Sequence, residues 1–189
     1  MIKLVAFLGN PGSQYEQTRH NVGWQIAENL ATLEYVQWQN KFKGLYVQEH
    51  AGSEKVTFLK PQTFMNNSGE SVQAIMHFFK FTPQELLVVY DDIEMNFGFV
   101  GFKKGGGLAG HNGLKSVANI LKTKDFFRFR FGVSRPTHGN VSSFVLSKFS
   151  TDEQIVLSVV LKKSGEMLEY CFLEGIETAV QKCQKVKLV

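Results

Sequence analysis

The sequence lacks the features that mark membrane-spanning, secreted and zinc-binding proteins. No stretch approaches the ~18 to 20 apolar residues that a spanning helix needs. The apolar run at residues 2–8 meets Gly9 at once and is too short for a secretory signal. The two cysteines, Cys171 and Cys183, form no Cys-x-x-Cys or Cys/His cluster, so they predict reduced thiols without a disulfide or a zinc site. We therefore expect a cytoplasmic protein that holds no metal.

Internal repeats and low-complexity linkers are also absent, and the 189 residues suit one domain with a substantial core. Hydrophobic residues make up 43% of the chain, which excludes global disorder. Lysine and arginine (21) exceed aspartate and glutamate (17), and the net charge of +4 is a mild bias toward anionic partners. We predict a single domain over residues 1–189 that acts as a monomer.

Hydrophobic periodicity predicts an alternation of strands and helices along the chain. The predicted strands are residues 2–8, 44–49, 55–59, 86–90 and 127–133, and the predicted helices are 22–33, 69–80, 113–121, 151–168 and 174–185. Ser68 is available as the N-cap of the second helix. This order predicts a single three-layer α/β domain with a twisted mixed β-sheet flanked by helices.

Polar residues follow several of the predicted strands. Asn10 follows the first strand, residues 65–67 lie beyond the strand that ends at Leu59, and residues 91–92 follow the strand that ends at Tyr90. A fourth polar group, residues 110–113, precedes a predicted helix. Ligand sites in α/β sheets gather at the carboxyl ends of strands, so we expect these groups to form one site.

His20 is the residue best suited to acid–base chemistry. An imidazole titrates near neutrality and can take a proton from water, provided that a partner fixes its tautomer. Asp91 or Asp92 is such a partner, whereas a helix cap or a surface position is the structural alternative for His20. His111 competes for the same role, but its flanking glycines favour a loop in which backbone conformation matters more.

Other catalytic and cofactor motifs are missing or incomplete. No serine lies in a Gly-x-Ser-x-Gly elbow, which disfavours a covalent acyl-enzyme. Residues 105–110 match Gly-x-Gly-x-x-Gly, but the largely polar segment 102–104, with two lysines, precedes them in place of a clear apolar strand. Leu114 interrupts a Walker-type Gly-Lys. Nucleotide binding is therefore disfavoured. The amides of Asn10, Asn66 and Asn112 suit a site that holds a peptide backbone or a water, with turn formation as their alternative role.

These motifs, taken in order, resemble the bacterial peptidyl-tRNA hydrolase family. The resemblance rests on residues 8–12 with Tyr15, residues 18–23, residues 60–69, residues 91–93 and residues 105–115, and it spans essentially the whole chain. It implies hydrolysis of the ester that joins a peptide to the 3′ end of tRNA, with peptidyl-tRNA as the partner and with no cofactor. Two alternatives stay open: an RNA- or ribosome-binding module that has lost hydrolysis, and a nucleotide-dependent enzyme.

The resemblance also implies roles for individual residues. His20 would be the general base that activates water, and Asp91 would orient it. Asn10 and Asn66 would hold the peptidyl part, while four further residues would line the cleft: Tyr15, Met65, Gly110 and Asn112. Lys103 and Arg130 would contact tRNA phosphates. Leu108, Ala109 and residues 95–98 depart from the family pattern, which bears on how mobile the rim of the cleft is.

Overall fold

The computed structural model describes all residues 1–189 and is built on one eight-stranded sheet in the order β2-β3-β4-β1-β5-β7-β6-β8. The four central strands are parallel, whereas β2, β3, β6 and β8 pair antiparallel with their neighbours. The strands are β1 (Leu4–Phe7), β2 (Gln39–Lys41), β3 (Gly44–Ala51), β4 (Glu54–Pro61), β5 (Leu86–Asp92), β6 (Phe99–Lys104), β7 (Phe127–Gly132) and β8 (Val186–Lys187).

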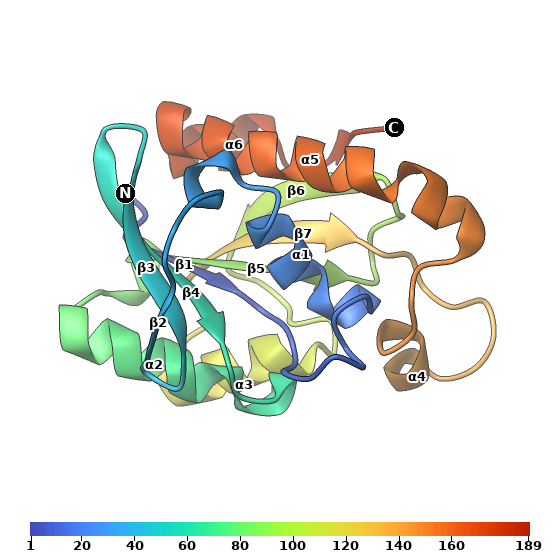
Figure 1. The fold of residues 1–189 in the computed structure, drawn as a ribbon, viewed down its shortest axis with the longest axis horizontal. Helices are drawn as coiled ribbons and strands as arrows, with labels where there is room; N and C mark the ends of the chain where they lie inside the picture. Colours follow the sequence, from blue (N-terminus) through green and yellow to red (C-terminus); the bar gives the residue numbers. More distant parts are fainter.

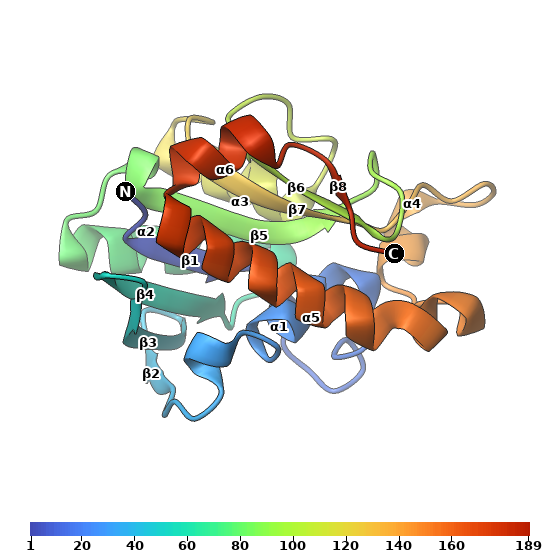
Figure 2. The same ribbon diagram turned by 90° about the horizontal axis from the view of Figure 1, so that it is seen from above.

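Helices cover both faces of this sheet (Figures 1 and 2). Helices α2 (Ser68–Phe79) and α3 (Asn112–Leu121) pack on one face, and α1 (Val22–Ala27), α5 (Thr151–Glu174) and α6 (Ile176–Lys182) on the other. A short helix, α4 (Val141–Val145), precedes α5 in the chain and contacts the Arg19–Asn21 turn. None of the helices has both the length and the apolar character needed to cross a membrane.

Alternation along the central strands fills two separate cores. Leu87 and Val89 point into the core beneath α1 and α5, whereas Leu86 and Val88 point into the core above α2 and α3. Both faces of the parallel strands are therefore buried, which explains why β5 reads as a continuous apolar run. The prediction of a three-layer α/β fold with a mixed sheet is confirmed.

Several local predictions were wrong in ways that have a physical cause. Ser68 does not cap α2, because its hydroxyl donates to the carbonyl of Met65 and the N-cap is Asn67. Strand β6 was not predicted, since only half of its side chains are apolar and Lys103 faces away from the core. The short helix α4 was also not predicted; the side chain of Asn140 caps it by accepting from the Ser143 N–H.

Candidate active site

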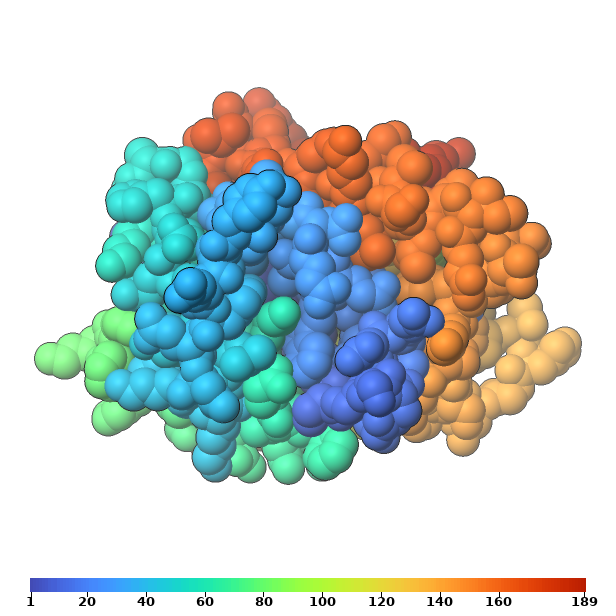
Figure 3. Space-filling model, viewed as in Figure 1, coloured from blue at the N-terminus to red at the C-terminus, as the bar shows by residue number.

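His20 lies in a short 3-10 turn, Arg19–Asn21, between the loop after β1 and helix α1. Its neighbour Arg19 fixes this turn against a distant part of the chain. The Arg19 guanidinium donates to the Ser147 hydroxyl at 2.8 Å and pairs with the Glu153 carboxylate at 2.6 Å. Figure 3 shows the resulting contact between the N-terminal loop, in dark blue, and the orange segment that leads into α5. His20 is therefore held in place and is only 7% exposed.

Asp91 is the partner of His20. It is the penultimate residue of β5, and its carboxylate Oδ1 lies 2.8 Å from the Nδ1 of His20. Asp92 points to the other face of the sheet, where its Oδ2 accepts from the Tyr90 hydroxyl at 3.1 Å and the Arg130 Nε at 2.7 Å. Residue chemistry alone left both aspartates open as partners, whereas the family resemblance pointed to Asp91, and alternation along β5 explains this choice.

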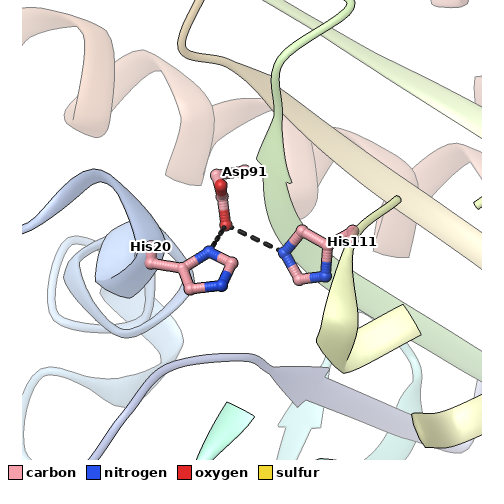
Figure 4. A group of neighbouring side chains, drawn as sticks. All are labelled: His20, Asp91 and His111. Atoms are coloured by element: carbon pink, nitrogen blue, oxygen red, sulfur yellow. Dashed lines mark hydrogen bonds and ion pairs between the residues drawn. The ribbon is translucent and has the colours of Figure 1, made fainter. Parts of the chain in front are cut away.

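A second histidine, His111, reaches the same carboxylate oxygen. Its Nε2 lies 3.0 Å from the Asp91 Oδ1, and its ring centroid lies 4.8 Å from that of His20 (Figure 4). His111 also caps α3, since its Nδ1 accepts from the Leu114 N–H at 3.2 Å. The side chain of His111 therefore takes part in the site, beyond the expectation of a loop residue at which backbone conformation matters more. The contact with Asp91 joins residues 20 positions apart, which no local pattern reveals.

These hydrogen bonds assign the protons on both rings. A carboxylate only accepts, so the Nδ1 of His20 carries the proton and its Nε2 keeps a lone pair. The Nδ1 of His111 accepts from backbone, so the proton of this ring is on Nε2 and points at Asp91. Asp91 thus receives two N–H groups, and the free Nε2 of His20 points away from it, as Figure 4 shows. This is the arrangement of a general base.

Burial and hydrogen bonding shift the pKa values of this group. Burial by itself raises the pKa of Asp91, but the adjacent rings of His20 and His111 outweigh it and hold that pKa well below its usual range. Burial lowers the pKa of His111, against the opposing charge of Asp91. The stable state of the site therefore pairs an ionised Asp91 with a neutral His111.

His20, Asp91 and His111 also bring three potential metal-ligand atoms within 4.8 Å of one another. The hydrogen bond from the Leu114 N–H argues against such a role, because it leaves the proton of His111 on the nitrogen that would have to bind the metal. The donor set fits a hydrogen-bonded triad better than a metal centre.

The three residues open into a cavity of about 660 Å³. All six residues predicted to bind substrate line it: Asn10, Tyr15, Met65, Asn66, Gly110 and Asn112. They come from loops after β1 and β4 and from the start of α3, so the carboxyl ends of the parallel strands form one site.

The three asparagines of this cavity differ in how they are held. Asn10 is buried: its Oδ1 accepts from the Met65 N–H at 2.7 Å, which leaves its NH₂ group without a protein partner. The Asn10 backbone N–H donates to the Asn21 Oδ1, and the Asn21 NH₂ group donates to the Asn10 carbonyl, each at 2.9 Å. Asn66 and Asn112 are exposed and make no side-chain hydrogen bond within the protein. All three thus offer amide groups to a ligand.

The remaining wall of the cavity was not predicted. Most of it consists of residues after β5 and around α4: Ile93, Arg135, Val141, Ser142, Val145 and Leu146. Phe64, Tyr90, Asp92 and Ala109 complete it. Arg135 pairs with Glu94 across its rim. The apolar spacing of Val141, Val145 and Leu146 was the available signal, but these residues contact the cavity only because β7 carries the chain back to it.

Lys103 and Arg130 lie outside the cavity, on the neighbouring strands β6 and β7. The ammonium group of Lys103 belongs to none of the ion pairs of the chain. Arg130 uses its Nε for Asp92, and this bond raises the pKa of its guanidinium against the effect of burial. We call these two residues the basic surface, although only 20% of the Arg130 side chain is exposed.

The glycine run at residues 105–110 does follow a strand, but not one that suits a dinucleotide. Strand β6 pairs antiparallel with β7, whereas the dinucleotide fingerprint needs a parallel β-α-β unit. Leu108 packs partly buried against the core above α3, and Ala109 adopts a positive φ of 47°. The loop is therefore anchored at Leu108 despite its glycines.

Comparison with known proteins agrees with this geometry. The model of the peptidyl-tRNA hydrolase family matches residues 4–188. A peptidyl-tRNA hydrolase of Citrifermentans bemidjiense is 44% identical over 179 residues, which cover 94% of this chain and 95% of that protein. One of Listeria welshimeri is 40% identical over 169 residues, which cover 89% and 92% of the two chains.

Solved structures give the same result. A peptidyl-tRNA hydrolase in complex with N-propanol superimposes with a TM-score of 0.87 at 32% identity and covers 97% of this chain and 96% of its own. The Acinetobacter baumannii peptidyl-tRNA hydrolase has a TM-score of 0.81 at 34% identity and covers 95% and 89%. The family resemblance of the sequence is thereby confirmed: this chain belongs to the peptidyl-tRNA hydrolase family.

Proposed function

We propose that this chain hydrolyses the ester bond between a peptide and the 3′ end of its tRNA, which returns the tRNA to translation. The observation that carries this proposal is the free Nε2 of His20, held by the 2.8 Å bond to Asp91 at the edge of a cavity large enough for part of a substrate. The chain belongs to a family named for this reaction.

His20 is the general base. Its Nε2 takes a proton from a water whose oxygen attacks the ester carbonyl, and the imidazolium then gives this proton to the departing 3′ ribose oxygen. Asp91 keeps the Nδ1 proton in place and stabilises the imidazolium that forms. His111 supplies the second hydrogen bond that orients the Asp91 carboxylate. An aminoacyl ester is reactive enough for one positioned base and a few hydrogen-bond donors to suffice.

The amides around the cavity hold the reacting group. The unpartnered NH₂ of Asn10 and the free amides of Asn66 and Asn112 bind the peptide backbone and the carbonyl oxygen, where negative charge develops during attack. Tyr15, Met65 and Gly110 complete the wall beside them. The apolar residues of α4 accommodate the peptide side chains.

Lys103 and Arg130 contact tRNA phosphates. Both are cations on adjacent strands outside the cavity, and this position supports contact with the nucleotides that lead away from the 3′ end. We further propose that the chain acts as a single-domain monomer in the cytoplasm, where translation produces peptidyl-tRNA, and that it needs no metal. Light scattering and chelator treatment test these two points, and a dimer or loss of activity with chelator would contradict them.

The test of the proposed function is release of the peptide from an N-blocked aminoacyl-tRNA. Wild-type protein should release it, and His20→Ala should lose most of this activity, since general-base catalysis contributes about 10² to 10⁴-fold. His77→Ala is the matched control, because His77 is exposed on α2 and should leave the rate unchanged. Binding of tRNA without hydrolysis by the wild type would favour the RNA-binding module instead.

A further inference from the structure

Arg128 is a buried cation that the proposed mechanism does not use. It is the second residue of β7, it is fully buried, and it forms no ion pair with a carboxylate. Burial lowers the pKa of its guanidinium, although Tyr90 and Asp92 nearby oppose this. A buried charge destabilises the fold unless hydrogen bonds compensate its lost hydration. The hydrogen-bond partners of Arg128 therefore indicate its role.

All three hydrogen bonds of Arg128 go to backbone carbonyls. One Nη donates to the Gly107 carbonyl at 2.6 Å, and the other donates to the carbonyls of Gly106 at 3.1 Å and Lys124 at 3.4 Å. Gly106 and Gly107 lie before α3, and Lys124 lies after it. One side chain therefore ties together both loops that connect α3 to the sheet.

These bonds determine which way the glycine loop presents its amides. The peptide bonds are trans, so an inward carbonyl places the N–H of the next residue outward. The carbonyls of Gly106 and Gly107 point at Arg128, and hence the N–H groups of Gly107 and Leu108 point away from it. Neither N–H donates to any group of the protein. The positive φ of Gly106, 89°, is part of this conformation.

Lys103 stands next to these amides. Its ammonium nitrogen lies 3.0 Å from the point where a Cβ on Gly106 would be, so only glycine leaves room for it. Nothing lies within 4 Å of the equivalent point on Gly107, which leaves the outer side of the loop open. Successive outward N–H groups beside an unpaired ammonium are donors of the kind that bind phosphate.

We infer that Arg128 is a positioning residue for tRNA: from beneath the glycine loop it holds the Gly107 and Leu108 amides beside Lys103, where they bind a backbone phosphate. The inference rests on the proposed function. It adds contacts between backbone N–H groups and a tRNA phosphate to the side-chain contacts proposed for Lys103 and Arg130. Being fully buried, Arg128 touches no substrate itself.

The test compares Arg128→Lys and Arg128→Met with wild type on two substrates: an N-blocked aminoacyl-tRNA and an N-blocked aminoacyl ester of adenosine, which carries no phosphate. Arg128→Lys keeps the buried charge but loses the fork that reaches several carbonyls. We expect its KM for the tRNA substrate to rise about tenfold, the effect of one lost hydrogen bond to a charged group, with kcat little changed. Its rate on the adenosine ester should equal that of wild type. Lys162→Met is the control for Arg128→Met, because it removes the same charge from an exposed position on α5. It should change neither the KM for the tRNA substrate nor the rate on the adenosine ester.

Inorganic phosphate gives a second readout that does not need activity. In wild type, the ¹⁵N amide resonances of Gly107 and Leu108 should shift with added phosphate, and in Arg128→Lys this response should weaken. An unchanged KM in Arg128→Lys, or equal losses on both substrates, would overturn the inference, as would amides that ignore phosphate. Wild-type inactivity on both substrates would instead contradict the proposed function.

Discussion

Replacement of Asp91 by asparagine isolates the contribution of its charge. The substitution keeps the size of the side chain and an oxygen that can accept from the His20 Nδ1, but it removes the negative charge 2.8 Å from that nitrogen. Two unit charges about 4 Å apart interact by about 4 kcal/mol at an effective dielectric constant of about 20. Because this attraction appears when His20 takes the proton from water, it lowers the barrier of the chemical step. Each 1.36 kcal/mol is about tenfold in rate, so kcat should fall about a thousandfold in Asp91→Asn.

Single-turnover release of the peptide from N-blocked aminoacyl-tRNA measures this rate without interference from product release. Asp92→Asn is the matched control, since Asp92 is the next residue, is also buried, and contacts Tyr90 and Arg130 rather than His20. We expect this control to keep kcat within a few-fold and to change mainly KM through Arg130. A loss of less than tenfold in Asp91→Asn, or equal losses of kcat in both variants, would refute the reasoning.

Three further predictions concern pH, the second histidine and the basic surface. The kcat/KM of wild type should rise with pH from mildly acidic conditions and then level off, because a protonated His20 cannot act as a base; a flat profile would contradict this. The free energy of unfolding should decrease as pH falls below about 6.5, since the unfolded chain binds a proton that buried His111 resists, and calorimetry should find this decrease weakened in His111→Ala. Lys103→Met and Arg130→Met should each reduce the slope of log KM against log salt by about one, and unchanged slopes would remove these residues from the tRNA contacts.

The part of the site formed at strand ends could be predicted from the sequence. Asn10 and Asp91 directly follow apolar runs, and the carboxyl ends of parallel strands meet at one edge of the sheet. The choice between Asp91 and Asp92 came from the family resemblance; without it, this choice needs the register of β5, because a shift by one residue exchanges the two faces. That register depends on packing across the sheet and not on local sequence.

The parts that could not be predicted depend on contacts between distant segments. The glycines that flank His111 indicated a loop residue, and only the packing of β5, α3 and β7 in the folded chain brings its ring to Asp91. Nothing in the alternating strand around Arg128 predicts its burial, whereas the loops around α3 cover it completely. Strand β6 has apolar side chains at only half of its positions, and Lys103 lies on the face turned away from the core. Its sequence therefore lacks a clear strand pattern.

The central claim is that His20 presents an unprotonated Nε2 to water while its Nδ1–H is bound to Asp91. The ¹⁵N spectrum of ring-labelled protein at a pH where His20 is neutral tests this claim directly, since it distinguishes the two tautomers of each histidine. We predict the Nδ1–H tautomer for His20 and the Nε2–H tautomer for His111, with His20→Ala and His111→Ala used to assign the signals. A neutral His20 with its proton on Nε2 would contradict the account, because the nitrogen that faces the cavity could then not accept a proton from water.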